Sequence, residues 1–206
     1  MTAAVVAGLL AGYGIAIPVG AVSAYLVSLT ARTGLRAGIG AALGVASADG
    51  LYALVAMIGG TAAARLLAPV LLPLRWASAL VLVVLALRTG IAAVRRYRTG
   101  SRDEIEVTAI GPVRAYFGLL GMTALNPLTV VYFTALVLGG SAAMTGNPGE
   151  QAVFVLAAFV ASASWQVLLA CGGALLGKVL TGSRGRLVTA TASSALVIAL
   201  AIRLVT

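Results

Sequence analysis

Asp49 is the only acidic residue inside any of the long apolar runs of this chain. An ionisable side chain at membrane depth is costly when it is unpaired, so it is a functional candidate by default. Small residues recur on the same helical stripe as Asp49: Ala42, Ala46, Ala53, Ala56 and Gly60. Because small residues let helices approach closely, we expect Asp49 to face the interior of a helix bundle. A purely structural hydrogen bond to a neighbouring helix is the alternative role.

Two prolines interrupt apolar runs that are long enough to cross a bilayer. Pro18 is followed by Gly20, and Asn126 directly precedes Pro127. Proline removes a backbone N–H, and a bilayer core has no water to satisfy the freed carbonyl, so the breaks should face protein or a cavity. Asn126 is a good N-cap for a new half-helix, whose partly positive end can bind a carboxylate, while Gly20 permits close backbone approach. Proline kinks stabilised only by packing are the alternative.

A polar and aromatic group occupies the middle of the fifth apolar run. It consists of Ser162, Trp165 and Gln166. Ser162 follows Asp49 by 113 residues, the offset that also relates two glycine pairs described below. We therefore expect Ser162 to be the counterpart of Asp49. Packing of Trp165 in the core, and a helix-joining hydrogen bond from Gln166, are the structural alternatives.

Composition identifies the protein class. The 206 residues are 61% hydrophobic and 9% charged, with a mean hydropathy of +1.09, whereas about a quarter of the residues in soluble domains are charged. An all-α polytopic membrane protein is predicted. The net charge of +9 does not indicate a nucleic-acid partner, because the basic residues lie between apolar runs rather than among aromatics. A single cysteine, Cys171, and no histidine exclude an intramolecular disulfide and predict no metal and no cofactor.

Six apolar runs of spanning length can be drawn along one membrane domain, 1–206. Their approximate bounds are 3–30, 37–60, 69–90, 113–140, 151–177 and 186–205. The first run has no basic residue before Arg32, so we interpret it as a permanent helix rather than a signal peptide. The longest polar connection, 91–111, separates a first half of about 3–90 from a second half of about 112–206.

Basic residues predict the orientation. The connections after the first, third and fifth runs carry eleven Lys and Arg residues, and the opposite side carries three. The positive-inside rule then makes these three connections, including 91–111, cytoplasmic and places both termini outside.

The two halves are related by an internal repeat. Pro18 and Pro127 are 109 residues apart, as are Gly12 and Gly121, and the pair Gly59-Gly60 precedes Gly172-Gly173 by 113. With three helices in each half, the second half must insert upside down relative to the first. This arrangement, in which the first and fourth helices are broken at Pro18 and Pro127, is the inverted-repeat plan of many secondary transporters.

Motifs for catalysis are absent from the sequence. It has no second intramembrane carboxylate, no Gly-x-Ser-x-Gly elbow, no histidine and no phosphate-binding Gly-x-x-x-x-Gly-Lys loop. An enzyme is therefore not expected.

Several motifs together resemble the lysine-exporter (LysE/RhtB) family of amino-acid efflux transporters. They are Pro18-Val19-Gly20, the Arg-Thr-Gly-Leu-Arg-Ala-Gly run at 32–38 that leads through Gly40 and Gly44 to Asp49-Gly50, and Asn126-Pro127. Family members usually have Pro-Gly-Pro where this chain has Pro18-Val19-Gly20, so it resembles a divergent member. The resemblance implies export driven by the proton motive force across the bacterial plasma (inner) membrane, with the Pro18 region, Asp49 and Asn126-Pro127 at the site.

The leading hypothesis is a secondary exporter of an amino-acid-like solute. The half-helix ends would receive its carboxylate, and Asp49 would receive its amine or a coupling proton. An exporter of metal or other inorganic cations from the same superfamily, and a non-transporting membrane scaffold, are the rivals. The expected partners are the small-molecule substrate and the lipid bilayer, without nucleic acid. The small-residue stripes fit a homodimer as well as internal packing.

Overall fold

The computed structural model describes residues 1–18, 20–67, 71–99, 110–126, 129–133, 147–179 and 183–203. Over these residues the chain is helical with short connections and has no strand, which confirms the predicted all-α fold class. The helices are α1 (Thr2–Ala16), α2 (Ala21–Thr33), α3 (Leu35–Leu67), α4 (Leu71–Thr99), α5 (Pro112–Ala124), α7 (Pro148–Val179) and α8 (Ser183–Arg203). Residues 129–133 form a further helical piece after α5.

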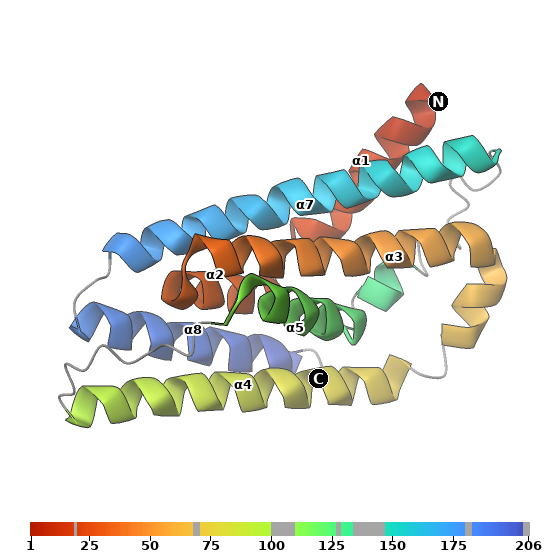
Figure 1. Cartoon of the computed structure of the whole chain (residues 1–206). Coiled ribbons are helices and arrows are strands. Elements are labelled where there is room, and N and C mark those ends of the chain that lie inside the picture. Colours follow the sequence, from red (N-terminus) through yellow and green to blue (C-terminus); the bar gives the residue numbers. More distant parts are fainter. Residues whose placement is uncertain are drawn as a thin grey trace.

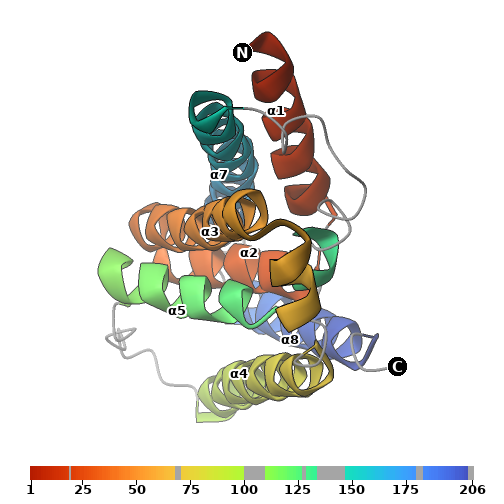
Figure 2. The same cartoon turned by 90° about the vertical axis from the view of Figure 1, so that its right-hand side faces the viewer.

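The helices stack in layers (Figure 1). In this view α7 lies above α3, while α2 and α5 lie beside or below α3, and α8 and α4 run together beneath them. Figure 2, turned by 90°, shows α3, α4 and α7 nearly end-on, with α5 crossing between α3 and α4. The colours in Figure 1 also show that α3 and α7 run in opposite directions.

Among the described helices, two are long and apolar enough to cross a membrane: Leu35–Ile58 within α3 and Pro148–Gly177 within α7. The bent pair α1 and α2 passes the same test as one broken span, and its two helices meet at 76°. The first predicted run, 3–30, is therefore divided at the position of Pro18.

The helices α3 and α4 continue beyond the predicted apolar runs. We expected apolar runs to end near residues 60 and 90, but α3 reaches Leu67 and α4 reaches Thr99. Residues 91–98 contain neither glycine nor proline, so nothing in the backbone chemistry stops the helix where the polar residues begin. The connection predicted at 91–111 thus starts as helix, and residues 100–109 lie outside the described part.

Glycines set the closest helix contacts. A Cβ added at Gly12 of α1 would meet the carbonyl oxygen of Ala158 in α7, and one at Gly44 of α3 would meet the carbonyl oxygen of Tyr116 in α5. Gly8 and Gly40, one turn earlier, meet α7 and α5 in the same way. These small-xxx-small pairs let helix backbones touch, which is how helices associate where apolar burial gives no driving force.

Asp49 lies between two apolar clusters of the core. One cluster joins α2, α4 and α5 to the first turns of α3, and it reaches Val45. The other begins at Ala53 and includes Phe133 and Phe154. The predicted small-residue stripe is buried, because Ala42, Ala46, Ala53 and Ala56 are all at most 4% exposed. The burial of its last member, Gly60, lies outside the described part.

The start of the chain lies beside the start of α7. The Met1 ammonium group forms an ion pair with Glu150 Oε1 at 3.0 Å. This contact places the N-terminus and the connection before α7 on the same side of the protein.

Candidate functional site

Asp49 and Ser162 meet where α3 crosses α7. The Ser162 hydroxyl donates a hydrogen bond of 2.7 Å to Asp49 Oδ2. Both side chains are buried, at 3% and 0% exposure. A lone acceptor in apolar surroundings needs a donor of this kind, since an unpaired buried charge is costly. The sequence predicted an interior Asp49 with Ser162 as its counterpart, and the structure brings the two into direct contact.

The first break separates α1 from α2. The helix α1 ends at Ala16, and Pro18 is exposed. Gly20 is the N-cap of α2 with extended backbone, and no side chain caps this helix. The first backbone bond runs from the Ala24 N–H to the Gly20 carbonyl at 3.0 Å. The N–H groups of residues 21–23 consequently have no partner within the helix, and a Cβ added at Gly20 would meet no atom of the described part of the chain within 4 Å.

Packing register places this break beside Trp165 and Gln166. Along the α1–α7 contact, Gly8 meets Phe154 and Ala157, and Gly12 meets Ala158 and Ala161. Along the α2–α7 contact, a Cβ at Gly173 would meet Val27, and one at Gly177 would meet Ala31. In both contacts, a step of four residues along α1 or α2 matches a step of four residues along α7. Continued to the break, this register places the end of α1 and the start of α2 beside the turn of α7 that follows Ser162.

The second break follows α5. The Tyr52 hydroxyl donates a hydrogen bond of 2.6 Å to the carbonyl of Ala124, the last residue of α5. The Asn126 carbonyl accepts the N–H groups of Thr129 and Val130, at 3.2 and 3.4 Å. Asn126 therefore occupies the backbone position of an N-cap, as predicted. Pro127 lies outside the described residues.

The two breaks lie on opposite sides of the Asp49–Ser162 bond. Tyr52 is three residues after Asp49 on α3, and Trp165 is three residues after Ser162 on α7. Because α3 and α7 are antiparallel, these residues project from the bond in opposite directions along the bundle (Figure 1).

Three buried polar atoms close to the two breaks have no hydrogen-bond partner among the described residues: Gln166 Oε1, Trp165 Nε1 and Thr123 Oγ1. Gln166 and Thr123 are 3% and 2% exposed. Buried polar groups are normally satisfied, so unsatisfied ones indicate a place where water or a ligand is accommodated. Gln166 and Trp165 were predicted site residues, whereas Thr123 was not. The sequence feature that could have indicated Thr123 is its position three residues before Asn126.

Tyrosines contribute more than the sequence indicated. Tyr52 binds the end of α5, and its ring stacks on Phe133 at a centroid distance of 6.1 Å. The Tyr132 hydroxyl donates to the Ala11 carbonyl of α1 at 2.9 Å, which ties the helical piece after the second break to the first half. The facing of these tyrosines depends on where the broken ends lie, and sequence periodicity does not determine it.

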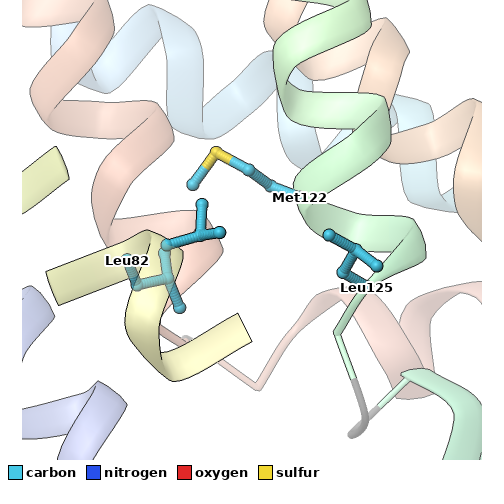
Figure 3. Close-up of a pocket in the computed structure, with 4 residues that line it drawn as sticks. Leu82, Met122 and Leu125 are labelled. Atoms are coloured by element: carbon cyan, nitrogen blue, oxygen red, sulfur yellow. The ribbon is translucent and has the colours of Figure 1, made fainter. Parts of the chain in front are cut away.

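A small apolar hollow lies next to the second break (Figure 3). It is lined by Val81 and Leu82 of α4 and by Met122 and Leu125 at the end of α5. Its volume is about 10 Å³, close to the minimum for one water molecule. All four lining residues are apolar, so this hollow is separate from the polar contact between Asp49 and Ser162.

The described residues contain no group of three His, Cys, Asp or Glu side chains arranged to hold a metal ion. Cys171 is a half-buried free thiol on α7.

Comparison with known proteins identifies the family. A family profile described as LysE type translocator matches residues 14–206. No curated protein and no solved structure matches this chain. The match covers both breaks, Asp49 and Ser162, and the apolar helices that it covers agree with a membrane location. The chain belongs to the LysE type translocator family, whose members are membrane transporters that export small solutes.

Proposed function

We propose that this protein is a secondary-active exporter of amino acids or similar small solutes, driven by the proton motive force. The observation that carries the proposal is the buried Asp49–Ser162 hydrogen bond, one turn from a broken helix on either side. A buried acidic group between broken helices is the arrangement by which many transporters bind a charged solute or a coupling ion.

We further propose six membrane spans arranged as two inverted repeats. The packing supports this plan, because α1 packs on α7 as α5 packs on α3, and α4 packs on α8. Under the offsets of 109 and 113 residues, α1 corresponds to α5 and α7 corresponds to α3, so the first two contacts are equivalent. Asp49 and Ser162, themselves related by 113, touch each other as residues on a pseudo-two-fold axis do.

The site offers opposite poles for a zwitterion. The open N-terminus of α2 at Gly20 has three N–H groups without helical acceptors, and the positive end of the helix dipole attracts a carboxylate. Asp49 supplies the negative pole for an amine or a proton. The buried amide oxygen of Gln166 is a further acceptor, and Trp165 and Asn126-Pro127 complete the proposed binding positions.

The proposed location is the bacterial plasma membrane, with both termini outside. The Met1–Glu150 ion pair supports a common side for the N-terminus and the connection before α7. The count of eleven basic residues against three supports the cytoplasmic side for the opposite connections.

Transport in vesicles tests the proposal. The protein is reconstituted in proteoliposomes, and uptake of a panel of labelled amino acids is measured with and without an imposed pH gradient. We expect uptake of at least one amino acid that stops when the gradient is collapsed. Matched assays with divalent and monovalent metal ions provide the contrast. Flux of a metal ion alone would replace the proposed substrate class, and absence of flux for every solute would favour a scaffold.

A further inference from the structure

Tyr52 and Trp165 occupy equivalent positions in α3 and α7. Each follows one member of the Asp49–Ser162 pair by three residues, so the offset of 113 relates them as well. Each is an aromatic ring with one polar hydrogen, a phenol O–H or an indole N–H, that can be donated to a carbonyl. Of the two donors, only the Tyr52 hydroxyl has a hydrogen-bond acceptor among the described residues.

Tyr52 replaces a hydrogen bond that the second break removes. In a continuous helix the Ala124 carbonyl would accept the N–H four residues further along the chain. Here α5 ends at Ala124, and the Tyr52 hydroxyl donates to that carbonyl at 2.6 Å. This bond holds the end of α5 against α3.

Trp165 has its donor in place but no acceptor. Its Nε1 atom is buried and has no hydrogen-bond partner in the part of the chain that the structure describes. Trp165 continues the stripe of α7 that packs on α1, four residues after Ala161. The α1 and α2 registers both place the first break at this level of α7.

The end of α1 has an acceptor that lacks its helical donor. Pro18 has no N–H, so it cannot satisfy the Gly14 carbonyl four residues earlier. The indole N–H of Trp165 and the Gly14 carbonyl, which lacks its helical donor, thus lie at a similar level of adjacent helices. In the other half of the protein, Tyr52 donates to the Ala124 carbonyl at the end of α5.

We propose that Trp165 is the positioning residue of the α1 break, as Tyr52 is of the α5 break, and that their two bonds form in alternate states. In the state described here, Tyr52 donates to the last carbonyl of α5, while Trp165 donates to no carbonyl among the described residues. In the other state, Trp165 donates to a carbonyl at the end of α1, and Tyr52 releases α5. The inference rests on the proposed inverted-repeat transporter, because the repeat is what makes the two positions equivalent.

Cysteine labelling of purified protein tests the alternation. Reporter cysteines replace Ile17 or Leu125, the exposed C-caps of α1 and α5, and labelling by a water-soluble maleimide is timed in a Cys171→Ser background. Tyr52→Phe should raise the rate at position 125 and lower it at position 17. Trp165→Phe should do the reverse. Each change should be about fivefold, the population shift that one neutral hydrogen bond confers.

The control variant is Trp76→Phe, which removes an indole that is 61% exposed on α4 and should move neither rate. Truncating a residue that only fills space would change the labelling rates at positions 17 and 125 in the same direction. Changes of equal sign, or none, in Tyr52→Phe and Trp165→Phe would overturn the proposal.

A second measurement does not require altering Trp165. Trp76→Phe leaves Trp165 as the only tryptophan of the chain, and the Raman band of its indole N–H reports hydrogen bonding at Nε1. Adding Tyr52→Phe should shift this band toward the hydrogen-bonded form, and an unchanged band would refute the alternation. Neither measurement uses a solute. The expected shifts without export of any solute would contradict only the proposed function, and export with unresponsive reporters would contradict only this inference.

Discussion

Asp49→Asn separates the charge of this side chain from its size. In the protein, Asp49 Oδ2 accepts one hydrogen bond of 2.7 Å from Ser162. A bond to an ionised group contributes about 1.5–3 kcal/mol and a neutral one about 1 kcal/mol. Because asparagine keeps an acceptor oxygen, we expect the variant to lose only about 1 kcal/mol of folding stability. Membrane insertion and detergent-solubilised yield should therefore be close to normal.

The expected effect on transport is larger than the effect on yield. If Asp49 binds the substrate amine or carries the coupling proton, loss of the ionised partner costs about 1–2 kcal/mol and weakens the functional interaction by roughly 5- to 30-fold. The wild-type export rate should vary with internal pH, and the Asn variant should show no such variation. The assay is proteoliposome flux over a range of internal pH, normalised to inserted protein.

Ser162→Ala is the matched control for this variant. It removes the hydrogen bond that Asp49→Asn keeps but leaves the carboxylate, so it should reduce thermal stability by a similar or larger amount and keep a pH-dependent rate. A wild-type rate with an unchanged pH profile in Asp49→Asn would refute the role assigned to the charge. Loss of the pH dependence in Ser162→Ala as well would show that transport requires the hydrogen bond in addition to the ionisable group.

Three further predictions concern the packing, the second break and the orientation. Gly12→Ala should lower thermal stability by about 1–3 kcal/mol, because its Cβ meets backbone atoms of α7, whereas Gly121→Ala, its repeat counterpart with open space around it, should be neutral or stabilising in a detergent melt. Pro127→Ala should insert normally and reduce flux about tenfold by restoring a backbone donor at the break; a wild-type rate would make the break a packing feature. In a cysteine-free background, impermeant maleimide applied to intact cells should label a cysteine at Asn147 and not one at Ser101, and the opposite pattern would reverse the orientation.

Residue type and spacing were sufficient to predict the interior of the bundle. The stripe that contains Ala42, Ala46 and Ala53 is buried because small residues at helical spacing pack only against another backbone. The offset between halves identified Ser162 as the counterpart of Asp49. It did not predict that the two touch, because contact depends on where α3 and α7 cross.

The partners at the helix ends were beyond sequence reasoning. The Tyr52 hydroxyl bonds to the Ala124 carbonyl because α5 stops at Ala124, and that end is fixed by three-dimensional packing rather than by periodicity. The helices α3 and α4 also extend past the predicted apolar runs. Hydropathy marks where apolar residues stop, whereas residues 91–98 continue as helix because they contain neither glycine nor proline.

The difference between the two breaks suggests how a zwitterion lies in the site. A C-terminal helix end presents carbonyls and attracts a cation, while an N-terminal end presents N–H groups and attracts an anion. At the second break, the Ala124 carbonyl is already bound by Tyr52. At the first break, the N-terminus of α2 has no side-chain cap among the described residues, and none of their atoms lies within 4 Å of a Cβ added at Gly20. We infer that the carboxylate lies at Gly20 and the ammonium group points toward Asp49.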